Sequence, residues 1–375
     1  MRPIRILIVD DAVVVRRLLA EALSSDPLVE VVGVAATGRI ALAKIPQVNP
    51  DLVVLDVEMP EMDGLATLAA IRETYRRLPV IMFSVLTERG AEATLDALAL
   101  GATDYVTKPT NMIRAGADLA GVYDVLTSKI KALCADVAGL GAATARPETA
   151  PMRPRRRRST PVRSLCRTEV VAVGASTGGP KALETFLTAL PPSFPVPIVI
   201  VQHMPPIFTR RLAQRLAAKS ALPIREGAPN AGLQPGHAWV APGDYHMTVA
   251  RAETGVRIRM HQAPPENSCR PAVDVLFRSV AATYGPGALA VVLTGMGRDG
   301  LRGCEDIREA GGQVLVQDEA SSVVWGMPGF VARADLADAV LPLDQLAPEV
   351  EWRVQIGRAA PAPAALETQG AAKKS

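Results

Sequence analysis

Short apolar runs alternate with segments of helical periodicity along residues 1–133. The runs that predict buried strands occupy residues 6–9, 29–34, 52–55, 80–83 and 102–106. After the first run, apolar residues recur at helical spacing at Leu18, Leu19, Ala22 and Leu23. Five strand–helix units of this kind predict an α/β domain, (βα)5, with a parallel, doubly wound sheet.

The same alternation resumes at residue 169. Strands are predicted at residues 170–173, 197–201, 238–241, 288–293, 313–316 and 339–341, and helices at residues 206–220, 273–284, 302–310 and 328–334. Two further runs, residues 248–250 and 256–260, flank Glu253-Thr254-Gly255 and predict an antiparallel hairpin. We therefore expect a second doubly wound, mostly parallel α/β domain with an antiparallel insertion.

The segments between and after these domains lack apolar periodicity. Residues 134–168 are rich in alanine, proline, threonine and arginine and predict a flexible linker, and residues 357–375 predict a disordered tail. The linker carries Arg153 and a run of arginines at residues 155–158, a charge pattern that also occurs where proteins bind nucleic acid or acidic membranes. Because no aromatic residues interleave with it, we favour a solvated spacer, and an acidic partner surface stays open. The expected division is 1–133, 134–168, 169–356 and 357–375.

The composition of the chain argues against several classes of protein. The chain has 375 residues and a net charge of only +3, so its overall charge does not favour nucleic acid as a partner. Its four cysteines, Cys134, Cys166, Cys269 and Cys304, form no C-x-x-C pair, which argues against a zinc site and against a disulfide framework. The apolar part of residues 2–9 is shorter than the apolar region of a signal peptide, and no apolar run approaches the roughly 20 residues of a membrane span. We expect a cytoplasmic protein without direct membrane insertion.

Polar residues follow the strands predicted in the first domain. They are Asp10 and Asp11 after the first strand, Asp56 after the third, Ser84 after the fourth and Lys108 after the fifth. The carboxyl ends of parallel strands meet at one edge, where doubly wound sheets bind ligands. Clustered carboxylates suit Mg²⁺, a carboxylate can accept a phosphoryl group, and a lysine and a hydroxyl can hold its oxygens. The alternative is that each aspartate merely caps a helix.

Three strands of the second domain also lead into reactive residues. Ser176 lies in Gly174-Ala175-Ser176-Thr177-Gly178, which fits the G-x-S-x-G turn of a nucleophilic serine. His203 follows the strand at residues 197–201, and Asp299 lies in the glycine-rich loop after residues 288–293. A hydroxyl, an imidazole and a carboxylate at one sheet edge are the groups of a Ser-His-Asp triad. Amides at the start of the helix opened by Pro180, or in the Met296 loop, could form an oxyanion hole.

Other interpretations of these residues remain. Ser176 could cap the following helix, His203 could be structural, and Asp299 could be a turn residue. Residues 174–181 read G-x-x-x-x-G-P-K, one residue off a phosphate-binding loop and without the following Ser or Thr. The order Ser, His, Asp also differs from the Ser, Asp, His order of α/β-hydrolases.

Motifs in the first domain resemble a known family. ILIVDD, VVLDVEMPEMDG and DYVTKP, within residues 4–125, resemble the receiver domain of response regulators. The resemblance implies that Asp10, Asp11 and Asp56 bind Mg²⁺ and that Asp56 is phosphorylated. It also implies that Ser84 and Lys108 contact the phosphoryl group and that Tyr105 is the aromatic residue of the switch.

Motifs in the second domain are similar to another family. GASTGGP, QHM and LTGMGRDG, supported by AVDVLFRSVA and PGDYHM, resemble the catalytic domain of chemotaxis protein-glutamate methylesterases over residues 168–350. The resemblance implies that Ser176, His203 and Asp299 are catalytic, that Thr177 and Met296 belong to the active-site loops, and that hydrolysis needs no cofactor.

The same resemblance implies the partners and the regulation. The family hydrolyses glutamate methyl esters on the cytoplasmic helices of chemoreceptors, releasing methanol, and deamidates certain receptor glutamines. Phosphorylation of the receiver by the chemotaxis histidine kinase relieves its restraint on the active site. An alternative function is a response regulator whose output domain binds DNA or a nucleotide. No helix-turn-helix pattern follows the linker to support DNA binding.

Overall fold

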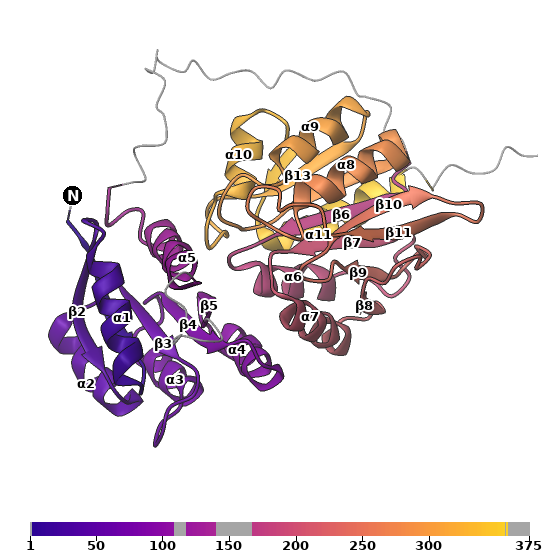
Figure 1. Ribbon diagram of the computed structural model, residues 1–375. Coiled ribbons are helices and arrows are strands. Elements are labelled where there is room, and N and C mark those ends of the chain that lie inside the picture. The colour runs from indigo at the N-terminus through magenta and orange to yellow at the C-terminus, as the bar shows by residue number, and fades with distance from the viewer. Residues whose placement is uncertain (1, 109–117, 140–166, 357, 359–375) are drawn as a thin grey trace, which may run out of the picture.

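The first domain is a five-stranded parallel sheet flanked by helices. The computed structural model describes residues 2–108, 118–139, 167–356 and 358 (Figure 1). The strands of this sheet are β1 (Ile4–Val9), β2 (Val29–Ala35), β3 (Leu52–Asp56), β4 (Val80–Val85) and β5 (Asp104–Lys108), in the order β2-β1-β3-β4-β5. Every neighbouring pair is parallel. The chain changes direction across the sheet at β1, so the ends of β1 and β3 form the switch point where such sheets bind ligands.

The helices of this domain are α1 (Val13–Ser24), α2 (Gly38–Val48), α3 (Gly64–Thr74), α4 (Glu88–Leu100) and α5 (Asp118–Leu133). Helices α2, α3 and α4 begin at polar cap residues, whereas the N-cap of α1 is Ala12, without a side-chain cap. The side chains of Thr37, Asp63 and Thr87 accept hydrogen bonds from the first turns of α2, α3 and α4. None of these caps is an aspartate that directly follows a strand, so those side chains remain available at the sheet edge.

The second domain is built around a seven-stranded parallel sheet. Its strands are β6 (Val170–Ala175), β7 (Ile198–Gln202), β8 (Ile224–Glu226), β9 (Ala238–Val240), β12 (Ala288–Val292), β13 (Gln313–Gln317) and β14 (Ala339–Leu341). Their order is β14-β13-β12-β6-β7-β9-β8, so β6 lies between β12 and β7. A separate antiparallel hairpin consists of β10 (His246–Arg251) and β11 (Val256–His261). The fold class expected from the sequence is confirmed.

The helices of the second domain cover both faces of its sheet (Figure 1). They are α6 (Gly179–Thr188), α7 (Pro206–Lys219), α8 (Val273–Tyr284), α9 (Leu301–Glu309), α10 (Met327–Arg333) and α11 (Leu343–Ile356), with a 3-10 turn η2 (Gly285–Gly287). The apolar pattern did not predict β8 and α11. Strand β8 has only three residues, of which one is buried, and Pro348 interrupts the helical pattern of α11.

Several sequence predictions fall on residues without a described structure. Residues 140–166, which include most of the predicted linker, Arg153 and the arginines at 155–158, lie outside the described residues. The predicted tail at 357–375 also lies outside them, apart from Arg358. None of the described helices is both long enough and apolar enough to cross a membrane.

The two domains pack against each other through α4 and α7. Leu95 and Leu98 of α4 line a small pocket together with Leu212 and Leu216 of α7, which lies beside α4 in Figure 1. The buried ring of Tyr105, at the start of β5, stacks on Phe208 of α7 with the ring centroids 4.8 Å apart. The interface therefore has an apolar centre built from both domains.

Ion pairs surround this apolar centre. Glu88 of α4 pairs with Arg211 of α7, and Asp96 pairs with Arg215. The carboxylates of both pairs come from the first domain and both guanidinium groups come from the second. The interface is therefore complementary in charge.

Candidate active site

The ends of three neighbouring strands bring the residues predicted for the triad to one edge. Ser176 follows β6, His203 follows β7, and Asp299 lies in the loop after β12. The amide of His203 donates to the carbonyl of Ala175 at 3.2 Å, and the amide of Ser176 donates to Thr294 at 3.1 Å. Strand β6 lies between β12 and β7. These two hydrogen bonds therefore hold Ser176 between the end of β7, which carries His203, and the loop after β12, which carries Asp299.

Ser176 lies in a tight turn that opens α6. Gly178, the N-cap of α6, has φ = +76°, and no side chain caps this helix, so the interpretation of Ser176 as its cap is wrong. A Cβ at Gly295 would lie 2.8 Å from the Cβ of Ser176, so only glycine allows the loop after β12 to approach the turn this closely. The side-chain amide of Gln202 donates to the carbonyl of Ser176 at 2.9 Å and fixes the turn.

His203 and Asp299 form a hydrogen-bonded pair. Nε2 of His203 lies 2.8 Å from Oδ2 of Asp299, and both side chains are largely buried. Burial alone would lower the pKa of His203, but the hydrogen bonds to Asp299 and Cys269 raise it above its usual value. Burial alone would raise the pKa of Asp299, but the hydrogen bond and charge of His203, with backbone amides, lower it. The pair therefore favours an imidazolium beside a carboxylate.

Asp299 is held at the N-terminus of α8. Its oxygens accept from the amides of Val273 at 2.7 Å and Asp274 at 3.0 Å, both in the first turn of that helix, and from the amide of Gly300 at 3.0 Å. Unpaired amides and the helix dipole favour a negative charge at this position. The carboxylate is therefore oriented by backbone groups of two segments and turned toward His203.

Two residues that sequence reasoning did not assign to the site support Asp299. The side-chain amide of Asn267 donates to Oδ1 of Asp299 at 3.0 Å and to Oδ2 of Asp274 at 2.8 Å. Burial, followed by the charge of Asp299, raises the pKa of Asp274 to about 6. Asp274 lies within the AVDVLFRSVA motif, so the sequence contained a signal for it. Asn267 lies 32 residues before Asp299 and gave none.

The structure does not join Ser176 directly to His203. Among the described residues, no hydrogen bond links the Ser176 hydroxyl to the imidazole ring. The second ring nitrogen, Nδ1, instead lies 3.5 Å from the sulfur of Cys269. The His203–Asp299 half of the predicted triad is thus formed, whereas the contact to the serine is not made in this arrangement.

The neighbouring loops contribute two free amides and one hydroxyl. The amides of Thr177 and Met296 donate to no acceptor in the described part of the chain. The hydroxyl of Thr177 donates to Oδ2 of Asp104 in the first domain at 2.8 Å. Thr177 and Asp104 are both buried. The turn that carries Ser176 is therefore in direct contact with the first domain.

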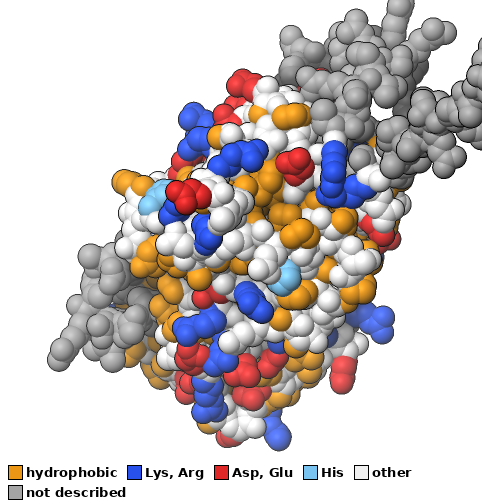
Figure 2. Space-filling view, turned by 90° about the vertical axis from the view of Figure 1, so that its right-hand side faces the viewer, with side chains coloured by type: hydrophobic (Ala, Val, Ile, Leu, Met, Phe, Trp, Pro, Cys, Tyr) orange, Lys and Arg blue, Asp and Glu red, His pale blue; other side chains and the backbone are white. Residues whose placement is uncertain are grey.

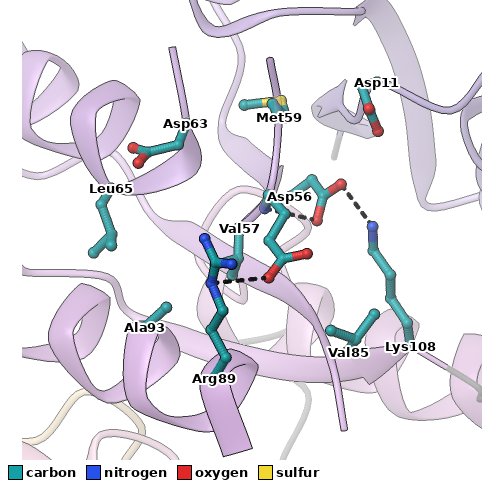
Figure 3. Close-up of a pocket in the computed structure, with 11 residues that line it drawn as sticks. Asp11, Asp56, Val57, Met59, Asp63, Leu65, Val85, Arg89, Ala93 and Lys108 are labelled. Atoms are coloured by element: carbon teal, nitrogen blue, oxygen red, sulfur yellow. Dashed lines mark hydrogen bonds and ion pairs between the residues drawn. The ribbon is translucent and has the colours of Figure 1, made fainter. Parts of the chain in front are cut away.

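A second constellation lies at the sheet edge of the first domain. Asp11, Asp56 and Lys108 line a pocket of about 690 Å³, shown in Figure 3. Nζ of Lys108 lies 2.7 Å from Oδ2 of Asp56 and 2.9 Å from Oδ2 of Asp10. Oxygens of Asp10, Asp11 and Asp56 lie within 4.8 Å of one another. The structure therefore gathers the three carboxylates and the lysine that the strand-end pattern predicted.

The electrostatics of this pocket fit a divalent cation. Burial, outweighing the charge of Lys108 and reinforced by the charge of Asp10, raises the pKa of Asp56 to about 6. Burial alone would lower the pKa of Lys108, but Asp56 and Asp10 raise it. Two buried carboxylates beside an exposed third one provide the hard oxygen ligands that Mg²⁺ prefers.

The side chains of Ser84 and Tyr105 contact other elements around the first domain's sheet edge. The buried hydroxyl of Ser84 donates to the carbonyl of Gly90 in α4 at 3.2 Å. The ring of Tyr105 points into the domain interface, and Lys129 of α5 lies over it at 5.3 Å from the ring centroid. These two residues connect the phosphoryl pocket with α4 and the interface, the elements that contact the second domain.

Comparisons with known proteins assign each of the two domains to a family. The family model described as CheB methylesterase matches residues 171–350, and the response regulator receiver domain model matches residues 6–117. A "protein-glutamate methylesterase/protein-glutamine glutaminase" of Trichodesmium erythraeum is 56% identical over 354 residues, covering 94% of this chain and 100% of the relative. One of Nocardioides sp. is 50% identical, covering 97% and 99%. The solved catalytic domain of Thermotoga maritima CheB methylesterase is 38% identical, covering 49% of this chain and 98% of that one, with a TM-score of 0.49.

The receiver model matches the first domain of the structure, and the methylesterase model matches the second. Both curated relatives align along nearly their whole length and nearly the whole of this chain, so the similarity is not confined to one domain. The chain belongs to the family of protein-glutamate methylesterases/protein-glutamine glutaminases that carry an N-terminal response-regulator receiver domain.

Proposed function

We propose that Ser176, His203 and Asp299 are the catalytic triad of this methylesterase and glutaminase and that phosphorylation of Asp56 controls access to it. The observation that carries the proposal is the hydrogen-bonded His203–Asp299 pair beside the Ser176 turn. The proposed substrates are glutamate methyl esters and glutamine amides on the cytoplasmic helices of chemoreceptors. The protein would act in the cytoplasm and receive its phosphoryl group from the chemotaxis histidine kinase.

The chemistry is acyl transfer in two steps. The Ser176 oxygen attacks the side-chain carbonyl carbon while His203 accepts the serine proton. The same proton then goes to the leaving group, which departs as methanol from an ester or as ammonia from a glutamine. Water, activated by His203, hydrolyses the acyl-enzyme to glutamate. Because Asp299 holds Nε2, the ring nitrogen that serves the serine is Nδ1.

The tetrahedral intermediates would be stabilised by the free amides of Thr177 and Met296. Each belongs to a loop that contacts Ser176, and neither donates to another described residue. Amides fixed in advance at the position where negative charge develops lower the barrier without reorganisation. The hydrolysis itself would then need no metal and no cofactor.

The proposed control begins at the receiver pocket. Receiver domains in general are phosphorylated in a Mg²⁺-dependent reaction, and here Asp10, Asp11 and Asp56 would hold the ion. It would offset the charge of the incoming phosphoryl group, with Lys108 contacting that group's oxygens. Ser84 would then leave the Gly90 carbonyl for the phosphoryl group and change the position of α4.

The domain interface would carry this change to the catalytic turn. Helix α4 supplies the carboxylates of the Glu88–Arg211 and Asp96–Arg215 pairs, and Tyr105 stacks on Phe208. The Thr177–Asp104 hydrogen bond ties the residue next to Ser176 to the receiver. Loss of these contacts would free the turn and open the site to a receptor helix.

A small phosphodonor with Mg²⁺ should raise methanol release from methyl-labelled receptor membranes by at least about tenfold, within the usual range of coupling between two sites. The Asp56→Asn variant should hydrolyse at the basal rate and show no response, because the amide cannot accept the phosphoryl group. Volatile methanol is measured with and without the donor. Equal stimulation of both proteins would rule out phosphorylation at Asp56.

Charge reversal at the interface should raise the basal rate without any phosphodonor. In Asp96→Lys the attraction to Arg215 becomes a repulsion, a change of about 1 kcal/mol for a surface pair. That corresponds to roughly fivefold in the population of open molecules. The control is Glu92→Lys, an exposed reversal on the same helix, since Glu92 forms no ion pair with a described residue. A basal rate that is unchanged in Asp96→Lys would contradict the restraint.

The alternative of a DNA- or nucleotide-binding output domain has no support. The second domain matches a methylesterase family along its whole sheet, and the turn at Gly174 is occupied by the proposed nucleophile. The face of the molecule in Figure 2 carries acidic and basic side chains side by side rather than a basic stripe. Nucleic acid is therefore not a proposed partner.

A further inference from the structure

Cys269 contacts His203, the proposed base, although the proposed hydrolysis gives its thiol no role. Its sulfur is 3.5 Å from Nδ1 of His203, and the residue is partly exposed. No sequence pattern predicts this pair, because the two residues are 66 positions apart and neither belongs to a metal-binding motif. The loop that carries Cys269 also carries Asn267, which bonds Asp299. A single loop therefore places a thiol and an amide on opposite sides of the His203–Asp299 pair.

The separation of the two atoms is that of two ligands of one zinc ion. Tetrahedral zinc binds histidine nitrogen at about 2.0–2.1 Å and cysteine sulfur at about 2.3 Å, which puts the two ligand atoms about 3.5 Å apart. The observed distance between Nδ1 and Sγ is 3.5 Å. Nitrogen and sulfur are the ligands that zinc prefers, whereas Mg²⁺ prefers oxygen.

The surroundings also resemble those of metal-binding histidines. A histidine that binds a metal through one ring nitrogen usually donates the other N–H to a carboxylate, which fixes the ring and its tautomer. Nε2 of His203 is bonded in this way to Asp299, at 2.8 Å. A carboxylate oxygen of Asp299 also lies within 4.8 Å of a ring nitrogen of His203 and of the Cys269 sulfur. The hydrogen bond to Asp299 thus orients the imidazole ring so that Nδ1 lies beside Cys269.

We propose that His203 and Cys269 form an inhibitory binding site for a thiophilic divalent cation, with Zn²⁺ as the best match. The ion would bind Nδ1 and the thiolate, with water completing its shell, and binding would release both the thiol proton and the Nδ1 proton of the imidazolium to solvent. Because Nδ1 is the nitrogen that must accept the Ser176 proton, the ion and the serine compete for it. The inhibitory effect rests on the proposed triad, whereas the binding itself does not.

The first experiment measures inhibition in the full-length, unphosphorylated protein. Chelator-treated enzyme is titrated with Zn²⁺ in a metal buffer, and methanol release is recorded relative to the metal-free rate of each variant. Half-inhibition in Cys269→Ser should need at least about tenfold more Zn²⁺ than in wild type, because a hydroxyl is a far weaker ligand than a thiolate. Mg²⁺ at the same concentrations should not inhibit either protein. Identical Zn²⁺ curves for both proteins would overturn the proposal.

The second experiment observes the site without relying on activity. Co²⁺, a coloured substitute for zinc, should give a thiolate-to-metal charge-transfer band in wild type and in Cys134→Ser, whose thiol is buried elsewhere. The band should be absent in Cys269→Ser. Absence of the band in wild type, or its persistence in Cys269→Ser, would refute the site. The result also separates the two proposals, since the band would remain even if Ser176 proved dispensable for hydrolysis.

The receiver pocket needs its own control, because its three carboxylates are a second possible location for a divalent ion. Asp11→Asn removes one of those ligands and leaves His203 and Cys269 intact. Zn²⁺ should inhibit this variant as strongly as wild type. Loss of inhibition in Asp11→Asn would place the effect in the receiver and overturn the proposed site.

Discussion

Ser176→Ala is expected to lower methanol release from methylated receptors by about 10⁴-fold or more, the scale of losses when a triad serine is removed. Without the hydroxyl no acyl-enzyme can form, and only binding and the oxyanion-hole amides remain. The amide of Ser176 and its bonds to Thr294 and Gln202 do not involve the lost oxygen, so the turn should keep its shape. Deamidation of receptor glutamine should fall in parallel, because both reactions use the same nucleophile.

The matched control is Ser193→Ala, an exposed serine in the loop between α6 and β7. It should hydrolyse as fast as wild type. Thermal unfolding followed by circular dichroism should give both variants the melting temperature of wild type, which excludes misfolding as the cause. Should Ser176→Ala release methanol at the rate of Ser193→Ala, the proposed triad would have to be abandoned.

Asp299→Asn is expected to lower kcat by about 10⁴-fold with a small change in KM, by analogy with the loss of a triad aspartate elsewhere. The asparagine amide can present only one acceptor oxygen, whereas the carboxylate accepts from the amides of Val273, Asp274 and Gly300 and pairs with His203. The imidazole would lose its orientation and the charge that stabilises its protonated form. The backbone donors would also lose an acceptor, so unfolding should occur at a lower temperature.

The pH profile separates this catalytic effect from a general loss of structure. Asp299 raises the pKa of His203, so in wild type the base becomes free of its proton only at higher pH. In Asp299→Asn the pKa of His203 falls, and the residual activity should reach its plateau at lower pH than in wild type. The control is Asp318→Asn, at the end of β13, whose carboxylate accepts from Ser321. A variant at Asp299 that keeps the wild-type rate and profile would show that His203 is not oriented by this carboxylate.

The periodicity of apolar residues was sufficient to predict most of the fold. Parallel strands buried on both faces read as continuous apolar runs, and β12 and β14 were found at or within one residue of their observed ends. The apolar periodicity did not predict strands that are too short, or too polar at their start, to show it. Strand β8 is too short to show a period, and β5 begins at Asp104, two residues after the apolar run suggested.

The sequence alone determined which residues stand at the ends of strands, and therefore that Ser176, His203 and Asp299 share one edge and Asp10, Asp11 and Asp56 another. This follows because the direction of parallel strands is fixed by their connections. Distances of a few ångströms between side chains are set by loops and by packing, which no local pattern encodes. Only the tertiary structure therefore decided that Cys269, rather than Ser176, lies beside Nδ1 of His203, and that Asp104 reaches Thr177 across the domain interface.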